Sequence, residues 1–149
     1  MRLRNHYLKF SARSDFIAAV LEGLPEAPPY FKHNAALNKQ GPELIDWKKP
    51  PETIAPDIKL TDIAKAYIVD LRDAELFAKS HIPNAVNIGL RGRLETWTGM
   101  MVPWGSSIIL CGNPAETEEA VFRLHRVGYH VAGVLSFDNW KQTALPVYK

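Results

Sequence analysis

The feature that most constrains the fold is an alternation, in residues 65–143, of short apolar segments with segments of helical periodicity. The apolar segments are rich in β-branched residues, which is typical of buried strands. One of them, Ser106–Cys111 (SSIILC), ends in a continuous apolar run, as expected for a strand covered on both faces. Strands that alternate with helices predict an α/β fold with a central parallel sheet flanked by helices.

Periodicity and capping residues give the expected elements. The strands are Lys65–Asp70, Ala85–Ile88, Ser106–Cys111 and Val131–Leu135, and the helices among them are Asp73–Ser80, Leu94–Val102, Glu116–Val127 (capped by Gly128) and Phe137–Thr143. Two further helices are expected before them, Asp15–Leu24 with Ser14 as N-cap and Phe31–Lys39. A proline-rich stretch then predicts a boundary between a helical N-terminal arm, residues 1–50, and a domain, residues 51–149.

Composition excludes several classes of function. The chain has 149 residues and a net charge of +2, so nothing favours a surface for nucleic acid or for an anionic membrane. It holds one cysteine and therefore no internal disulfide, which suits a reducing compartment. Its start lacks the apolar run of a signal peptide, and no run is long enough for a membrane helix. We expect a cytoplasmic protein.

The single cysteine is the candidate nucleophile, because the carboxyl ends of parallel strands are where sites form. Cys111 ends an expected strand and is followed by Gly112–Thr117 (GNPAET). Asn113 could cap a helix with Pro114 at its first position and Glu116 at its third. Alternatively, Thr117 could be the N-cap, which would leave a longer loop. The sequence leaves both starts open.

Four motifs, in order, resemble the rhodanese family of sulfurtransferases. They are YIVDLRD (67–73), FAKSHIPNAVNI (77–88), the strand and helix around Cys111, and GYHVAGVLSFDNW (128–140). The resemblance implies a rhodanese-like domain that carries sulfur from thiosulfate or a persulfide as a persulfide on Cys111, without a cofactor. It implies supporting roles for Asp70 and Arg72, which could instead tie the strand end to neighbouring backbone. Arg91 and Arg93 follow the second strand near the same sheet edge, so they are candidates for binding an anionic sulfur donor, or else they form a solvated face. The resemblance also implies a backbone cradle for the sulfur donor built from Gly112, Asn113, Ala115, Glu116 and Thr117.

The residues after the cysteine also support the opposite interpretation. Pro114 removes one N–H group from the cradle. Glu116 places a carboxylate where a cation would help, which would raise the pKa of the thiol and repel an anionic donor. A sulfurtransferase and a catalytically inactive rhodanese-like module therefore both remain open.

A narrower resemblance concerns the arm. Residues 5–42 and LETWTGMMVPW (94–104) are similar to metallo-β-lactamase–rhodanese fusion proteins. The chain has no His-x-His-x-Asp-His motif, so we expect no metal site. An inactive module would bind a metallo-β-lactamase-type hydrolase, or a second copy of itself, through residues 1–50.

Three further expectations concern side chains outside the motif. Trp97, Trp104 and Trp140 are expected to be core or interface aromatics rather than substrate-stacking residues. His81 is expected to bond nearby backbone in its turn. The run RLHR (123–126) is expected to form a solvated helix face, with Leu124 pointing inward.

Overall fold

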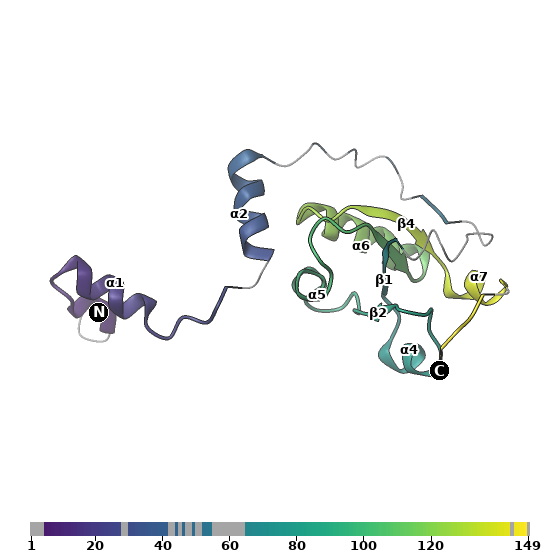
Figure 1. The fold of residues 1–149 in the computed structure, drawn as a ribbon, viewed down its shortest axis with the longest axis horizontal. Helices are drawn as coiled ribbons and strands as arrows, with labels where there is room; N and C mark the ends of the chain where they lie inside the picture. Colours follow the sequence, from purple (N-terminus) through teal and green to yellow (C-terminus); the bar gives the residue numbers. More distant parts are fainter. Residues whose placement is uncertain are drawn as a thin grey trace.

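A computed structural model describes residues 5–27, 30–41, 44, 46, 49, 52–54, 65–143 and 145–148 (Figure 1). Its elements are η2 (His6–Lys9), α1 (Arg13–Leu21), α2 (Tyr30–Gln40), β1 (Tyr67–Asp70), α4 (Ala74–Lys79), β2 (Val86–Asn87), α5 (Leu94–Met101), β3 (Ile108–Cys111), α6 (Pro114–Arg126), β4 (Val131–Leu135) and α7 (Phe137–Lys141). None of these helices combines the length and the apolar character that crossing a bilayer requires. The boundary expected between residues 50 and 51 lies outside the described residues.

The four strands form one parallel sheet in the order β2-β1-β3-β4, which confirms the α/β prediction. Asp70 pairs with Cys111, and Cys111 pairs with Leu135 on its other side. Because the strands are parallel, these three residues end their strands at the same edge of the sheet.

A short segment near the start of the expected domain, residues 52–54, runs along β4, the outer strand. Val134 donates its N–H to the carbonyl of Glu52 and accepts the N–H of Ile54, both at 2.8 Å. Gly133 permits this approach, since a Cβ there would lie 2.7 Å from the Ile54 side chain. The backbone of the outer strand is therefore paired on both sides along this stretch.

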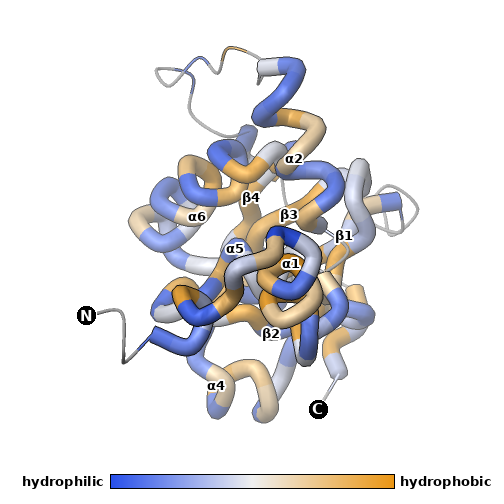
Figure 2. Tube along the Cα trace, turned by 90° about the vertical axis from the view of Figure 1, so that its left-hand side faces the viewer, coloured by the Kyte–Doolittle hydropathy of each residue, from blue (hydrophilic) through white to orange (hydrophobic). Residues whose placement is uncertain are grey.

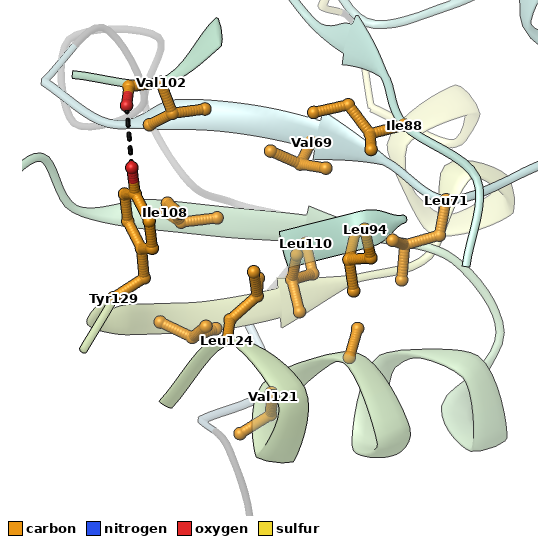
Figure 3. Close-up of a cluster of buried hydrophobic side chains, with 12 residues drawn as sticks. Val69, Leu71, Ile88, Leu94, Val102, Ile108, Leu110, Val121, Leu124 and Tyr129 are labelled. Atoms are coloured by element: carbon orange, nitrogen blue, oxygen red, sulfur yellow. Dashed lines mark hydrogen bonds between the residues drawn. The ribbon is translucent and has the colours of Figure 1, made fainter. Parts of the chain in front are cut away.

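The two faces of the sheet have separate cores because side chains alternate along each strand. On β3, Ile108 and Leu110 face α5 and α6, whereas Ile109 and Cys111 face α7. Figure 3 shows the first core, which also contains Val69, Leu71, Ile88, Leu94, Val121, Leu124 and Tyr129. The second core is completed by Ile68, Ile82, Leu135, Phe137 and Trp140.

Helix α2 lies against the domain beside α5 (Figure 1). Its Tyr30 packs on Gly99, where a Cβ would lie 2.7 Å from the tyrosine ring. Its His33 stacks on Trp104 with ring centroids 4.6 Å apart. Leu37 packs on Gly128, whose φ of +82° is a conformation that favours glycine.

Helix α1 stands clear of the domain, at the far end of the arm (Figure 1). Figure 2 views the molecule from that end, with orange apolar positions along α1. No residue of α1 is buried. The expected N-cap is wrong: the helix starts two residues earlier than predicted, Ala12 is at the cap position, and no side chain caps it. The hydroxyl of Ser14 instead donates to Asp15, 3.1 Å away.

Candidate functional site

The carboxyl edge of β1 and β3 brings Cys111 next to Asp70. Both side chains point to the α7 face of the sheet, and both have no exposed surface. Burial raises the pKa of the Cys111 thiol from 9.0 to about 12, and the negative charge of Asp70 adds to the rise. The Arg72 guanidinium acts in the opposite direction but does not offset these effects. With such a pKa, the thiol is protonated at neutral pH.

Asp70 and Arg72 form a tight ion pair rather than facing open solvent. Arg72 Nη2 lies 2.7 Å from Asp70 Oδ2, and Arg72 also donates its backbone N–H and its Nε–H to the same carboxylate. The guanidinium lies 3.6 Å from the centroid of the Phe137 ring and donates to the carbonyl of Ser80. The pair thus joins the end of β1 to the turn after α4 and to α7, which is a structural connection.

The turn after Cys111 is closed by a capping box. Asn113 Oδ1 accepts the N–H of Glu116 at 2.9 Å, and a Glu116 carboxylate oxygen accepts the N–H of Asn113 at 3.4 Å. Pro114 is the first residue of α6, which confirms one of the two starts that the sequence left open; the expected range from Glu116 began two residues too late, and the start at Thr117 does not occur. Instead, Thr117 is 3% exposed and its hydroxyl donates to the carbonyls of Asn113 and Pro114.

This capping arrangement uses most of the backbone donors of the turn. Gly112 donates its N–H to the carbonyl of Leu135, and Thr117 donates its N–H to the carbonyl of Asn113. Asn113 and Glu116 donate within the capping box, and Pro114 has no N–H. In this fully described turn, four N–H groups are therefore already bonded and are not free to surround an anion. The thiol of Cys111 also lies on the opposite face of the sheet from α6.

Three shallow clefts lie near the carboxyl edge. A cleft of about 420 Å³ is lined by Arg72, Gly112, Asn113, Glu116, Phe137 and Lys141 among others. Cys111 does not line it. Arg91 lines a second cleft, which Glu116 also lines. Arg91 and Arg93 both line a third cleft, beside α5. The structure therefore brings Arg72 and residues of the turn together at the first cleft. Arg91 shares the second cleft with Arg72 and Glu116, and Arg93 lines the third.

A comparison with protein families identifies the fold. The model of the rhodanese-like domain matches residues 56–143. The chain belongs to this family. None of the curated proteins compared with the chain matches it.

Two solved structures with the same fold differ in how much of their own length matches this chain. A metallo-beta-lactamase from Staphylococcus aureus is 22% identical with a TM-score of 0.67, covering 87% of this chain and 36% of its own. A rhodanese-related protein from Thermoplasma volcanium is 18% identical with a TM-score of 0.55, covering 65% of this chain and 97% of its own. The chain thus spans about a third of the staphylococcal protein, and that likeness extends beyond the residues of the rhodanese-like domain.

One charged residue of this rhodanese-like domain has a role that the sequence did not indicate. The prediction of a solvated helix face is wrong for Arg123, which is held by Glu95 through two contacts of 2.7 Å. Arg123 also donates to the carbonyls of Leu90 and Gly92, and so fixes the loop that carries Arg91. The sequence signal was weak, because Glu95 is 28 residues away and belongs to a different helix.

The remaining expectations about single residues have mixed outcomes. The prediction for His81 is confirmed, since its Nδ1 lies 3.1 Å from the carbonyl oxygen of Phe77. Trp140 is buried in the α7 core and Trp104 packs against the other core, as predicted. Trp97, however, is 52% exposed.

Proposed function

We propose that this rhodanese-like domain is a non-catalytic module that acts through contacts with other proteins. The observation that carries this proposal is the capping box of α6, which engages the N–H groups of Asn113 and Glu116 in the turn after Cys111. Without these donors, neither an anionic sulfur donor nor a persulfide has the stabilisation that a thiolate site needs.

The electrostatics of the thiol support the same proposal. Sulfur transfer starts from a thiolate, and the buried position beside Asp70 keeps Cys111 protonated. The alternative, a sulfurtransferase with a persulfide on Cys111, is supported by the position of the cysteine at the end of β3. It would require the turn to open and the side chain to turn away from the α7 core.

We propose two alternative partners. A metallo-β-lactamase-type hydrolase is supported by the likeness to the staphylococcal metallo-beta-lactamase, which covers 87% of this chain. A second copy of the chain is supported by apolar surface on the arm, which is the subject of the next subsection.

A mass measurement tests the absence of catalysis. The folded chain is incubated with thiosulfate, and separately with a low-molecular-weight persulfide, and its intact mass is measured. We expect no gain, whereas the same chain unfolded in urea, with its thiol exposed, should gain one sulfur atom from the persulfide. That unfolded sample shows that the donor is active, and Cys111→Ser shows where sulfur attaches.

The opposite outcome is equally specific. If the folded chain gained one sulfur atom, released it to cyanide as thiocyanate, and lost this ability in Cys111→Ser, the domain would be a sulfurtransferase.

A further inference from the structure

The outer part of the arm exposes several large apolar side chains. Between residues 5 and 27 no residue is buried. We call the large apolar side chains in this segment that are more than 40% exposed the arm patch; they are Tyr7, Leu8, Phe16, Ile17, Leu21 and Leu24. Exposed apolar patches of this kind mark surfaces that bind another molecule.

Helix α1 also lacks the means to be stable alone. It has nine residues, and no side-chain cap satisfies its first N–H groups. Isolated helices shorter than about 12–15 residues are marginal in water, and packing of an apolar face provides most helical stability in proteins. A surface that covers the arm patch is therefore needed for α1 to persist as a helix.

A second apolar surface lies on the domain. Trp97, Met100 and Met101 occupy one face of α5 at the spacing i, i+3 and i+4, and are 52%, 57% and 47% exposed. We call these three residues the α5 patch. Helix α2 packs on a different side of α5, since Tyr30 rests on Gly99, which helical spacing places away from these three residues. The α2 contact at Gly99 therefore leaves the α5 patch exposed.

Charges at the two patches are complementary. Arg91 and Arg93 are exposed and line the same cleft as Trp97 and Met101. Glu22 and Glu26 are exposed and follow α1, next to Leu21 and Leu24 of the arm patch. Opposite charges at the rim of an interface favour one orientation of encounter and one register.

The connection between α1 and α2 bears on whether the arm patch can cover the α5 patch of its own chain or that of a second chain. Residues 22–29 (EGLPEAPP) contain three prolines, which restrict the preceding residues to extended conformations. Figure 1 shows α1 directed away from the domain while α2 lies against it. A return of α1 onto its own α5 would need a reversal within this stiff connection.

We propose that the arm patch of one chain covers the α5 patch of a second copy, and that the exchange is reciprocal. A two-fold pair of this kind buries both patches on both chains with one set of contacts used twice. The proposal agrees with the non-catalytic role but does not depend on the state of Cys111.

Sedimentation or light scattering of the full chain over a wide concentration range gives the first test. We expect a dimer of twice the 16.8 kDa chain mass. Two variants should each be monomeric while keeping the spectrum and melting of the domain: Phe16→Glu/Leu21→Glu in the arm patch, and Trp97→Glu/Met101→Glu in the α5 patch. All four positions are exposed, so the fold of the domain does not depend on them.

Mixing the two variants provides the decisive measurement. The arm variant keeps an intact α5 patch and the α5 variant keeps an intact arm, so their equimolar mixture should form a weakened heterodimer with one working contact. Arm-to-arm or α5-to-α5 pairing would leave one of the variants dimeric and give no recovery on mixing. Either result would overturn the proposal.

Charge reversal tests the register. Arg91→Glu/Arg93→Glu should weaken the dimer, and Glu22→Arg/Glu26→Arg in the same chain should restore it. A wild-type chain that stays monomeric at all concentrations would refute the dimer even if the mass measurement with persulfide shows no catalysis. A failure of the dimer and a failure of the non-catalytic role are therefore distinguishable.

Discussion

At the scale of single residues, the side of the strand to which Cys111 points matters more than its position along the chain. The residue ends β3, where an active site in a parallel sheet is expected. Because side chains alternate between the two faces of the sheet, the thiol nevertheless points into the α7 core, beside Asp70. A strand reverses the direction of its side chains at each residue, so a shift of one position would have moved the thiol to the other face.

The raised pKa of Cys111 predicts a loss of stability at high pH. The unfolded thiol ionises near pH 9, and the folded thiol near pH 12. Between these values the unfolded state gives up a proton that the folded state retains. The stability that the buried, protonated thiol contributes is therefore fully present below pH 9. Between pH 9 and pH 12 the free energy of unfolding decreases by about 1.4 kcal/mol per pH unit.

Urea unfolding of the wild-type chain and of Cys111→Ala at increasing pH measures this effect. Subtracting the two curves cancels the titration of the lysines and tyrosines that both chains share. The free energy of unfolding of the wild type minus that of Cys111→Ala should be constant below pH 9 and should decrease as the pH rises above 9. Parallel curves up to pH 12 would show that the thiol is not buried as described.

At the scale of elements, the start of α6 separates two interpretations that the sequence left open. The pattern Asn-Pro-Ala-Glu is sufficient for a capping box, and the structure contains one. We predict that Asn113→Ala lowers the free energy of unfolding by about 1 kcal/mol, because the N–H of Glu116 loses its acceptor. Asn113→Asp keeps an acceptor oxygen and should be close to the wild type in chemical unfolding.

The same pair of variants distinguishes a cap from a substrate loop. Neither should gain sulfur from thiosulfate, since Cys111 points away from α6 in either case. A gain of sulfur in Asn113→Ala alone would mean that the cap restrains an otherwise active cysteine.

The elements were predictable where periodicity and local chemistry decide them. Strand β4 has the predicted limits, and the buried residues Ala120, Val121 and Leu124 of α6 recur at the spacing of an amphipathic helix. Long-range partners were not predictable: Arg123 finds Glu95 only because α5 and α6 lie side by side. The face of the sheet to which Cys111 points was also not predictable, because β3 is apolar on both faces and its sequence does not distinguish them.

At the scale of the whole molecule, two glycines allow the arm to sit on the domain. Gly99 receives Tyr30, and Gly128 receives Leu37 and Trp104. We predict that Gly99→Ala displaces Tyr30 and loosens α2, although alanine by itself favours the helix α5. Hydrogen exchange should become faster in residues 30–40 and stay unchanged in β1 and β3.

Gly89→Ala is the matched control, because a Cβ at that position meets nothing within 4 Å. Unchanged exchange in residues 30–40 of Gly99→Ala would show that α2 is not held by this contact.

The segment Glu52–Ile54 has a consequence for the solubility of the domain. An uncovered outer strand offers its N–H and C=O groups to any other chain in an extended conformation, which is a common route to aggregation. Here the polypeptide that leads from the arm occupies those groups on Val134 before another molecule can. A shortened chain that keeps the rhodanese-like domain in solution should therefore begin ahead of Glu52, so that this pairing is retained.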